Sequence, residues 1–366
     1  MTTNDQDLSD DLDPSADLDP SADLDPSADL DPSGELFEHH RIIAQPGQAL
    51  LRIDKFLFNL LPNTSRSRLQ LAAKAGYLHV NGKAVKSNYK VRPEDIVTLE
   101  LPQPMREFEL IAEDIPLDIR YEDDHLAVLH KPTGLVVHPG IGNYTGTLVN
   151  GLIFHFGQLA SKEGQPVPRP GLVHRLDKNT TGLMVIGKTE HALSHLSEQF
   201  YVRSTERRYH ALVWGDVENA GRVESHIGRS VADRRVQAVF PDGDQGKHAI
   251  THYTPIERFG PVTLVECKLE TGRTHQIRVH MQSIGHPLFG DATYGGAQTV
   301  KGLKTGKYEQ FVRNSFEILQ RQALHAKTLG FEHPDTGEMM RFDSELPDDM
   351  IEVLDRWRRY LKAPTR

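Results

Sequence analysis

The chain has 366 residues, 38% of them hydrophobic, and a formal net charge of −9 at pH 7. This length allows two or three domains with a sizeable core. A single cysteine, Cys267, excludes an intramolecular disulfide and a cysteine-rich zinc module, so a reducing compartment is expected. No run of about 18 apolar residues and no signal-peptide pattern occurs, and we therefore expect a cytoplasmic protein that does not enter a membrane.

The negative charge is concentrated at the N-terminus. Residues 1–38 hold thirteen Asp and Glu and no Lys or Arg, which leaves 51 − 13 = 38 acids against 42 bases, or about +4, for residues 39–366. The segment repeats DLDPSA three times and then reads DLDPSG. One Leu per repeat cannot build a core, so we predict a disordered acidic tail over 1–38. The tail is either a tandem duplication without an essential role or an acidic arm that competes with nucleic acid for basic surface.

Residues 47–102 have the pattern of a small separate domain. Apolar residues recur at helical spacing from 53 to 61, and Ser65 is placed to cap a second helix that ends at Gly76. Short strands are predicted at 77–80 and 95–101, with an Asn81-Gly82 hairpin turn after the first.

This segment is also basic. From Arg52 to Arg92 it carries nine Lys and Arg and one acid, Asp54. Such a run is usually only a solvated face, but on two helices and a hairpin it suits phosphate binding. The order RIDKFL, SRSRLQ, AGYLHVNGK, YKVRPEDIV resembles an S4 RNA-binding domain. The candidate RNA contacts in it are Arg52, Lys55, Arg66, Arg68 and Lys83.

From residue 107 to the end at 366 the chain alternates short strand patterns with Gly and Pro turns. Strands are expected at 126–129, 182–186, 209–213, 252–256 and 262–270. One helix is expected after Thr189 as its N-cap, and another from Asp348 with Met350, Ile351, Leu354, Trp357 and Leu361 as its apolar stripe. No βαβ regularity is present, so we predict an α+β domain with a mainly antiparallel sheet.

Three polar segments interrupt these patterns: HRLDKNTTG (174–182), RRYHALVWG (207–215) and TGRTHQIRVH (271–280). An ionised Asp177 in a closed pocket needs a cation, and Arg175, Arg273 and Arg278 are candidates. Strand alternation would put Arg175 on the same side as Asp177. One carboxylate held by arginine suits nucleophilic or proton-transfer chemistry better than hydrolysis. The alternative is an Asp–Arg pair that only ties loops together.

The segment HRLDKNTTGLMVIGKT resembles the signature of the RluA-type pseudouridine synthases. The resemblance continues through HKPTGLVVHPG (130–140), LETGRTHQIRVHM (269–281), HPLFGDATYGG (286–296) and RQALHA (321–326). It covers about residues 47–362 and implies the pseudouridine synthase fold, a mainly antiparallel mixed sheet with flanking helices, behind an S4 domain.

The resemblance also implies roles for residues. Asp177 is then the nucleophile or base at the ribosyl C1′ position, Arg278 its ion-pair partner, and Tyr209 the platform for the base, while Arg175 and Arg273 contact RNA. Isomerisation needs no cofactor and no metal, and we expect a monomer that acts on 23S ribosomal RNA of the large subunit. The alternatives are a synthase for tRNA or another rRNA site, and a non-catalytic S4-type assembly factor.

Overall fold

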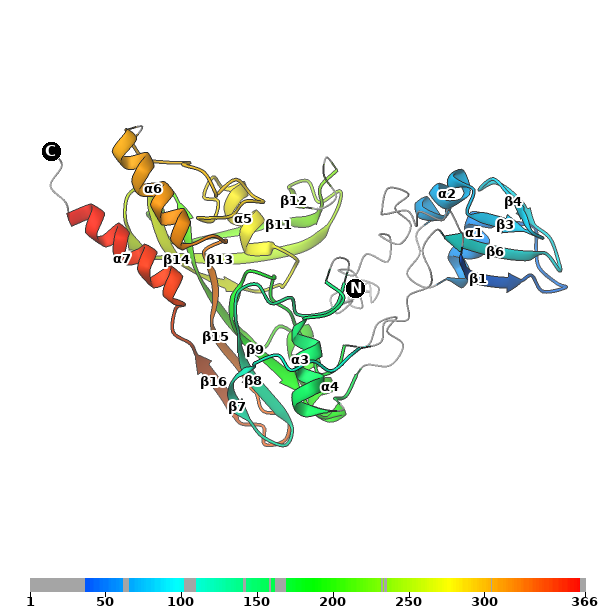
Figure 1. The fold of residues 1–366 in the computed structure, drawn as a ribbon, viewed down its shortest axis with the longest axis horizontal. Coiled ribbons are helices and arrows are strands. Elements are labelled where there is room, and N and C mark those ends of the chain that lie inside the picture. The colour runs from blue at the N-terminus through cyan, green and yellow to red at the C-terminus, as the bar shows by residue number, and fades with distance from the viewer. Residues whose placement is uncertain are drawn as a thin grey trace, which may run out of the picture. The chain divides into compact units, whose positions relative to one another are not determined.

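The computed structural model divides into two compact units, Met1–Glu109 and Leu110–Arg366 (Figure 1). It describes residues 37–61, 66–101, 110–140, 143–157, 159–161, 169–231, 233, 236–303 and 305–362. The predicted acidic tail, apart from its last two residues, and the Ser65 cap lie outside these ranges. No helix within the described ranges is long and apolar enough to span a bilayer.

The first unit is a small sheet with two helices. Its sheet has the order β1-β6-β3-β4, and a separate pair joins β2 to β5. Its elements are β1 (Phe37–Ile43), β2 (Leu51–Arg52), α1 (Ile53–Leu60), α2 (Arg66–Ala75), β3 (Leu78–Val80), β4 (Lys83–Ala84), β5 (Lys90–Val91) and β6 (Ile96–Leu101). The apolar positions of both helices and of β3 and β6 form one core, as the helical spacing predicts.

The hairpin turn between β3 and β4 is held by a buried carboxylate. Asn81 and Gly82 adopt φ of 51° and 77°, the left-handed pair that the Asn-Gly dipeptide favours. Asp95 accepts hydrogen bonds from the Asn81 amide at 2.9 Å, the Tyr89 hydroxyl at 3.0 Å and the Arg92 N–H at 2.8 Å. The spacing of Asn, Tyr and Asp in this segment is therefore explained by folding.

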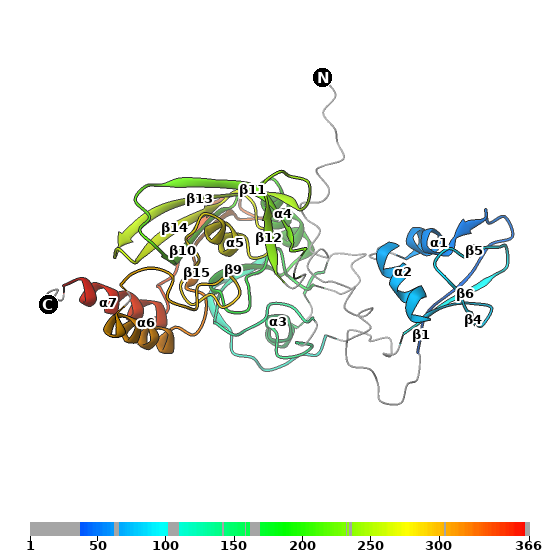
Figure 2. The same cartoon turned by 90° about the horizontal axis from the view of Figure 1, so that it is seen from above.

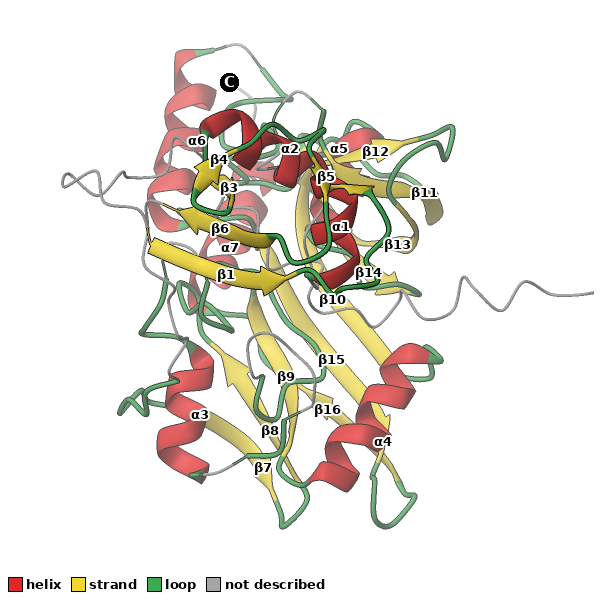
Figure 3. Ribbon diagram, turned by 90° about the vertical axis from the view of Figure 1, so that its right-hand side faces the viewer, coloured by secondary structure: helices red, strands yellow, loops and turns green. Residues whose placement is uncertain are grey.

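The second unit is built on a ten-stranded sheet of order β12-β11-β13-β14-β10-β15-β9-β8-β7, with β16 paired to β15 (Figure 3). The strands are β7 (Asp118–Glu122), β8 (Leu126–Lys131), β9 (Thr181–Gly187), β10 (Glu206–Trp214), β11 (Gly221–Arg229), β12 (Gln237–Phe240), β13 (Lys247–Arg258), β14 (Val262–Leu269), β15 (Leu324–Glu332) and β16 (Met339–Asp343). Neighbours are antiparallel except β9 and β15, which are parallel. The predicted α+β class with a mainly antiparallel sheet is confirmed.

Helices cover both faces of this sheet. Ala211, Val213 and Val265 share a core with α3 (Leu148–Phe156) and α5 (Gln276–Ser283), whereas Leu212 and Leu264 share one with α6 (Gly306–Ile318) and α7 (Asp348–Lys362). Because successive strand residues point to opposite faces, α5 lies on one face and the α6–α7 pair on the other. Figures 1 and 2 both show α6 alongside α7.

The remaining helix, α4 (Glu190–Tyr201), packs on β9 and β15, and Figure 3 shows it across β8 and β9 from α3. Its predicted cap is present, since the Thr189 hydroxyl accepts the Ala192 N–H at 3.1 Å. The predicted stripe of α7 is wrong at two positions: Ile351 is 38% exposed and Leu361 52% exposed. Ile351 lies one helical step away from buried Met350, and Leu361 follows the last buried turn, so neither reaches the core.

Candidate active site

The segment HRLDKNTTG forms a turn that leads into β9. His174 Nε2 accepts the Val185 N–H of β9 at 3.1 Å, and the imidazole stacks on Phe200 of α4 with ring centroids 4.6 Å apart. Burial and the charge of Arg207 lower the pKa of His174 to about 3, so the ring is neutral. The expected strand alternation of Arg175 and Asp177 is wrong, because this segment is not a strand. Arg175 is exposed and the Asp177 side chain is 22% exposed.

Each of the four residues after Asp177 is held by a polar side chain from β8, from β15 or from the segment just before β15. The bonds are Lys131 Nζ to Lys178 O at 2.9 Å, Arg321 Nη1 to Asn179 O at 3.1 Å, Gln322 Nε2 to Thr180 Oγ1 at 3.3 Å, and Thr181 Oγ1 with His325 Nδ1 at 2.9 Å. A turn fixed at every residue presents its carboxylate in one position, which preorganised catalysis requires.

Gly182 ends this turn, at the point where β9 pairs in parallel with β15. Its φ is 122°, and a Cβ added there would lie 2.3 Å from the Ala326 carbonyl oxygen. Only glycine allows this backbone conformation and this close approach. The glycine of HRLDKNTTG therefore sets how the catalytic turn enters the sheet.

Lys131 is a buried cation beneath the turn. Its Nζ donates to the carbonyls of Pro132 at 2.8 Å, Leu135 at 2.9 Å and Lys178 at 2.9 Å. Burial lowers the pKa of Lys131 to about 7, while the charge of Asp177 acts to raise it. Three acceptors use all three ammonium protons, so the protonated form is the one that satisfies this site.

Arg278 of α5 lies between two carboxylates. Its Nη1 donates to Asp177 Oδ2 at 3.0 Å, and its Nε and Nη2 donate to Asp291 Oδ2 and Oδ1 at 2.7 and 3.0 Å. Asp291 is 1% exposed and also accepts the N–H groups of Thr293 and Tyr294 at 3.0 and 3.2 Å. The hydrogen bonds and charges of both carboxylates outweigh burial and raise the pKa of Arg278, so the guanidinium is a permanent cation beside Asp177.

The carboxyl of Asp177 stays ionised in this pocket. Burial acts to raise its pKa, but the charges of His275, Arg278 and Arg175 and the hydrogen bond from Arg278 together hold the pKa below its ordinary value. Burial also lowers the pKa of His275, so its charge contributes only under acidic conditions, and Arg278 and Arg175 supply the positive charge that remains at pH 7. The carboxylate is thus available as a nucleophile or base at neutral pH.

Tyr209 lies in β10 between Cys267 of β14 and Ala326 of β15. It is 8% exposed, within the same core as Leu176 and Ile277, which neighbour Asp177 and Arg278 in sequence. Burial and the charge of Asp177 raise the pKa of its hydroxyl against the opposing charge of Arg207. The structure therefore places Tyr209 close enough to Asp177 to feel its charge, as a neutral phenol.

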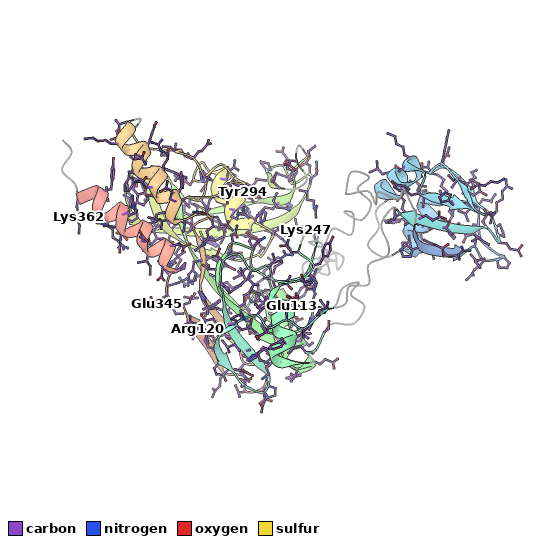
Figure 4. All side chains as sticks on the ribbon, in the orientation of Figure 1. Glu113, Arg120, Lys247, Tyr294, Glu345 and Lys362 are labelled. Carbon is purple, nitrogen blue, oxygen red and sulfur yellow. The ribbon has the colours of Figure 1, made fainter. Side chains whose placement is uncertain are left out.

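His275 is a further residue of this pocket. It has a left-handed φ of 55° at the start of α5, and its Nε2 lies 3.9 Å from Asp177 Oδ1. Its Nδ1 is 2.9 Å from the hydroxyl of Tyr294, a residue labelled in Figure 4, and that hydroxyl accepts the Gln237 N–H at 3.0 Å. We assign the phenol hydrogen to Nδ1, which places the imidazole proton on Nε2, toward Asp177.

The other residues predicted to contact RNA differ in their surroundings. Arg273 Nε donates to the His248 carbonyl at 3.1 Å. In the first unit, Arg52 donates to both oxygens of buried Asp54 at 3.0 Å, and Arg66 adds a third bond at 3.1 Å. Lys55 and Lys83 are exposed, and the Arg68 side chain lies outside the described part of the structure.

The local sequence patterns assign no role to Asp291, Lys131, Arg321 or His275. Each lies inside a string that resembles the family, and that position is the only signal in the sequence. Within the described ranges no three His, Cys, Asp or Glu side chains are arranged to hold a metal ion.

This site combines an ionised carboxylate from the turn before β9, an arginine of α5 held by a second carboxylate, and a buried phenol of β10. Residues 125–283 match the family model for RNA pseudouridylate synthase, and residues 51–97 match the S4 domain.

Similar proteins agree with these matches. A protein of Chlorobaculum parvum named as an uncharacterised RNA pseudouridine synthase is 47% identical over 318 residues, covering 86% of this chain and 97% of its own length. The ribosomal large subunit pseudouridine synthase D of Zymomonas mobilis is 44% identical over 302 residues, covering 82% and 91%. The solved structure of human RNA pseudouridylate synthase domain containing 4 is 25% identical, with a TM-score of 0.47, and covers 66% of this chain and 92% of that one.

The chain therefore belongs to the RNA pseudouridine synthases, isomerases that act on RNA, and carries an S4 RNA-binding domain ahead of the synthase domain. The predicted family is confirmed.

Proposed function

We propose that this protein isomerises uridines of 23S ribosomal RNA and that Asp177 acts at C1′ of the target nucleotide. One observation carries the proposal: Asp177 accepts a 3.0 Å hydrogen bond from Arg278, whose other donors are fixed by Asp291. An ionised carboxylate in a fixed position is what cleavage of a glycosidic bond needs.

The reaction moves the ribose from N1 to C5 of the same uracil. Asp177 either attacks C1′ or removes a ribose proton, and in both cases the N1–C1′ bond breaks. The uracil rotates and C5 bonds to C1′; as this bond forms, the ester bond between Asp177 and C1′ breaks in the first case, and the removed proton returns to the ribose in the second. The proton on C5 then leaves, and N1 gains a proton. No atom is gained or lost overall, so the balance needs no redox partner. The target uridine must leave any helical stack to enter the pocket, at a cost of a few kcal/mol.

A hydrolytic glycosidase is disfavoured by the second carboxylate. A hydrolase needs a carboxylate free to activate water. Asp291 is 1% exposed, and its oxygens receive two bonds from Arg278 and two from backbone N–H groups. It holds the arginine instead.

The choice of 23S rRNA is supported by the relatives' names. Six relatives at 42 to 46% identity are named ribosomal large subunit pseudouridine synthase D. Mapping pseudouridines in rRNA and tRNA from a deletion strain, complemented with the wild-type chain, tests this choice. We expect specific 23S sites to be lost and restored; loss confined to tRNA would replace 23S rRNA as the substrate.

The role of Asp177 is tested by Asp177→Asn, which keeps the shape and removes the charge. We expect no pseudouridine in a single-turnover assay while RNA affinity stays within about threefold of wild type. Asp216→Asn is the matched control, because Asp216 pairs with Arg258 on the exposed surface. Turnover by Asp177→Asn above a trace would remove Asp177 from the reaction.

A further inference from the structure

Arg207 is a buried arginine that forms no ion pair with a described residue. It is 8% exposed, and its Nε, fully shielded from solvent, has no hydrogen-bond partner. Burial lowers the pKa of Arg207; ionisation of the Tyr209 hydroxyl would act to raise it, and the like charge of Arg203 lowers it, while no carboxylate in the described part of the chain is paired with the guanidinium. Burying an unpaired cation is costly, so such a residue is commonly completed by a ligand.

The Arg207 side chain is nevertheless held in a defined position by its neighbours. Its guanidinium carbon lies 5.2 Å from the centroid of the Phe200 ring, whose other contact is the stacked imidazole of His174. On another side, a Cβ added to Gly272 would lie 3.0 Å from Arg207 Nη1. The absence of a side chain at Gly272 keeps room for the guanidinium between α4 and the loop before α5.

Arg207 also has a defined relation to the active site. Along β10, buried Arg207 and Tyr209 alternate with exposed Arg208, so both project to the same side of the strand. The two are about 7 Å apart along the strand, and the charge of Arg207 acts on the Tyr209 hydroxyl and on His174, three residues before Asp177.

We propose that Arg207 binds a phosphodiester of the RNA backbone next to the target uridine, and that the phosphate is the counter-ion that the free protein lacks. A base at Tyr209 and a phosphate at Arg207 then belong to the same or adjoining nucleotides. The guanidinium fork matches two phosphate oxygens. This inference rests on the proposed function only for the identity of the RNA, since phosphate binding can be measured without turnover.

The test compares Arg207→Met with Arg208→Gln in the full chain, each in the Asp177→Asn background so that the RNA stays unmodified. Methionine keeps apolar contact with Phe200 and removes the charge. Arg208 is the matched control, because it is exposed and pairs with Glu266 at 2.6 Å. The probe is an RNA hairpin with one uridine in its loop, and the measurements are thermal unfolding of the free proteins and the affinity across a salt titration.

We expect Arg207→Met to keep or raise the melting temperature of the free protein, because it removes an unpaired buried charge. RNA affinity should fall about tenfold, and the slope of log affinity against log salt should fall by about 0.7. Arg208→Gln should change neither. A lower melting temperature with an unchanged salt slope would make Arg207 a structural residue and overturn the proposal.

A second arm locates the phosphate. Single methylphosphonate substitutions are placed along the loop, each of which removes one backbone charge. At one position beside the uridine, we expect the methylphosphonate to lower the RNA affinity of the protein that keeps Arg207 by about tenfold. The same substitution should leave the RNA affinity of the Arg207→Met protein unchanged. If no position behaves in this way, the ligand of Arg207 is not an RNA phosphate. If the assignment of 23S rRNA as substrate is wrong, this is seen in a different experiment: the pseudouridine map of rRNA from the deletion strain is then unchanged.

Discussion

Asp291 holds Arg278 through two hydrogen bonds, of 2.7 Å to Nε and 3.0 Å to Nη2, and leaves Nη1 to donate to Asp177. The two bonds fix the plane of the guanidinium, and the plane fixes the direction of the third bond. The position of the Asp177 carboxylate thus depends on a residue 13 positions beyond the arginine, within the sequence GDATYGG.

Asp291→Asn tests this dependence. The amide can still bond to Arg278 but has lost its charge, so we expect the single-turnover rate at saturating RNA to fall about ten- to a hundredfold through misplacement of Arg278. RNA affinity should stay within about threefold, because Asp291 is buried. A variant whose affinity drops while its saturated rate is retained would make Asp291 part of RNA binding instead.

Arg278→Met should impair catalysis more than Asp291→Asn does. It removes the cation that keeps Asp177 ionised and leaves Asp291 buried without its partner, which destabilises the fold by about 3 kcal/mol. We expect a rate near that of Asp177→Asn at a temperature where the variant is folded, as judged by circular dichroism. An unchanged single-turnover rate with weaker RNA binding would reassign Arg278 as a phosphate contact.

Tyr209→Phe separates the ring of Tyr209 from its hydroxyl. We propose that the phenol takes part in the C5 proton transfer, and loss of a proton-transfer group typically costs about a hundredfold or more in rate. RNA affinity should be unchanged, because the ring remains for stacking, whereas Tyr209→Leu should lose both. A rate within threefold of wild type in Tyr209→Phe would show that only the ring matters.

The basic face of the S4 domain divides into two groups with different expected behaviour. Lys55→Gln and Lys83→Gln should each lower the slope of log affinity against log salt by about 0.7 to 0.9 if the lysine contacts a phosphate. Arg52→Gln should instead destabilise the domain by about 1 to 2 kcal/mol, because buried Asp54 loses two of its charge-assisted bonds while its partner is partly solvated. Equal salt effects for all three, with no loss of stability in Arg52→Gln, would contradict this division.

Buried His280 makes the fold sensitive to mild acid. It is 0% exposed, lies 2.9 Å from both Ser225 Oγ and Thr251 Oγ1, and burial lowers its pKa to about 4. Between pH 6.5 and about 4 the unfolded chain binds a proton that the folded chain does not, so the free energy of unfolding falls as the pH falls, by a few kcal/mol at most.

His280→Gln removes this titration while keeping polar contact with both hydroxyls. Urea unfolding at pH 7, 6, 5 and 4 should therefore give a shallower loss of stability for the variant than for the wild type. Identical pH dependence in the two proteins would show that the pKa of His280 is the same in the folded and the unfolded chain.

Much of the fold and of the site could be predicted from local patterns. The Asn81-Gly82 turn, the Thr189 cap, the strand at 262–270 and the α+β class depend on residues close together in the chain, and the structure agrees with each. The helices α3, α5 and α6 were not predicted. α5 is only eight residues long and polar in sequence, and its helical state comes from packing against β11, β12 and β13.

The sequence by itself determined which residue types are available at the catalytic turn, because HRLDKNTTG and HQIRVH are contiguous strings with a recognisable resemblance. Only the tertiary structure decided how they are used. Asp177 and Arg278 are 101 residues apart, and Arg321 reaches the turn across 142. The same holds for charge: Arg52 and Arg66 are paired with Asp54, while Arg207 is buried without a carboxylate. The energy of a charge depends on its solvation and its neighbours in space, and chain order specifies neither.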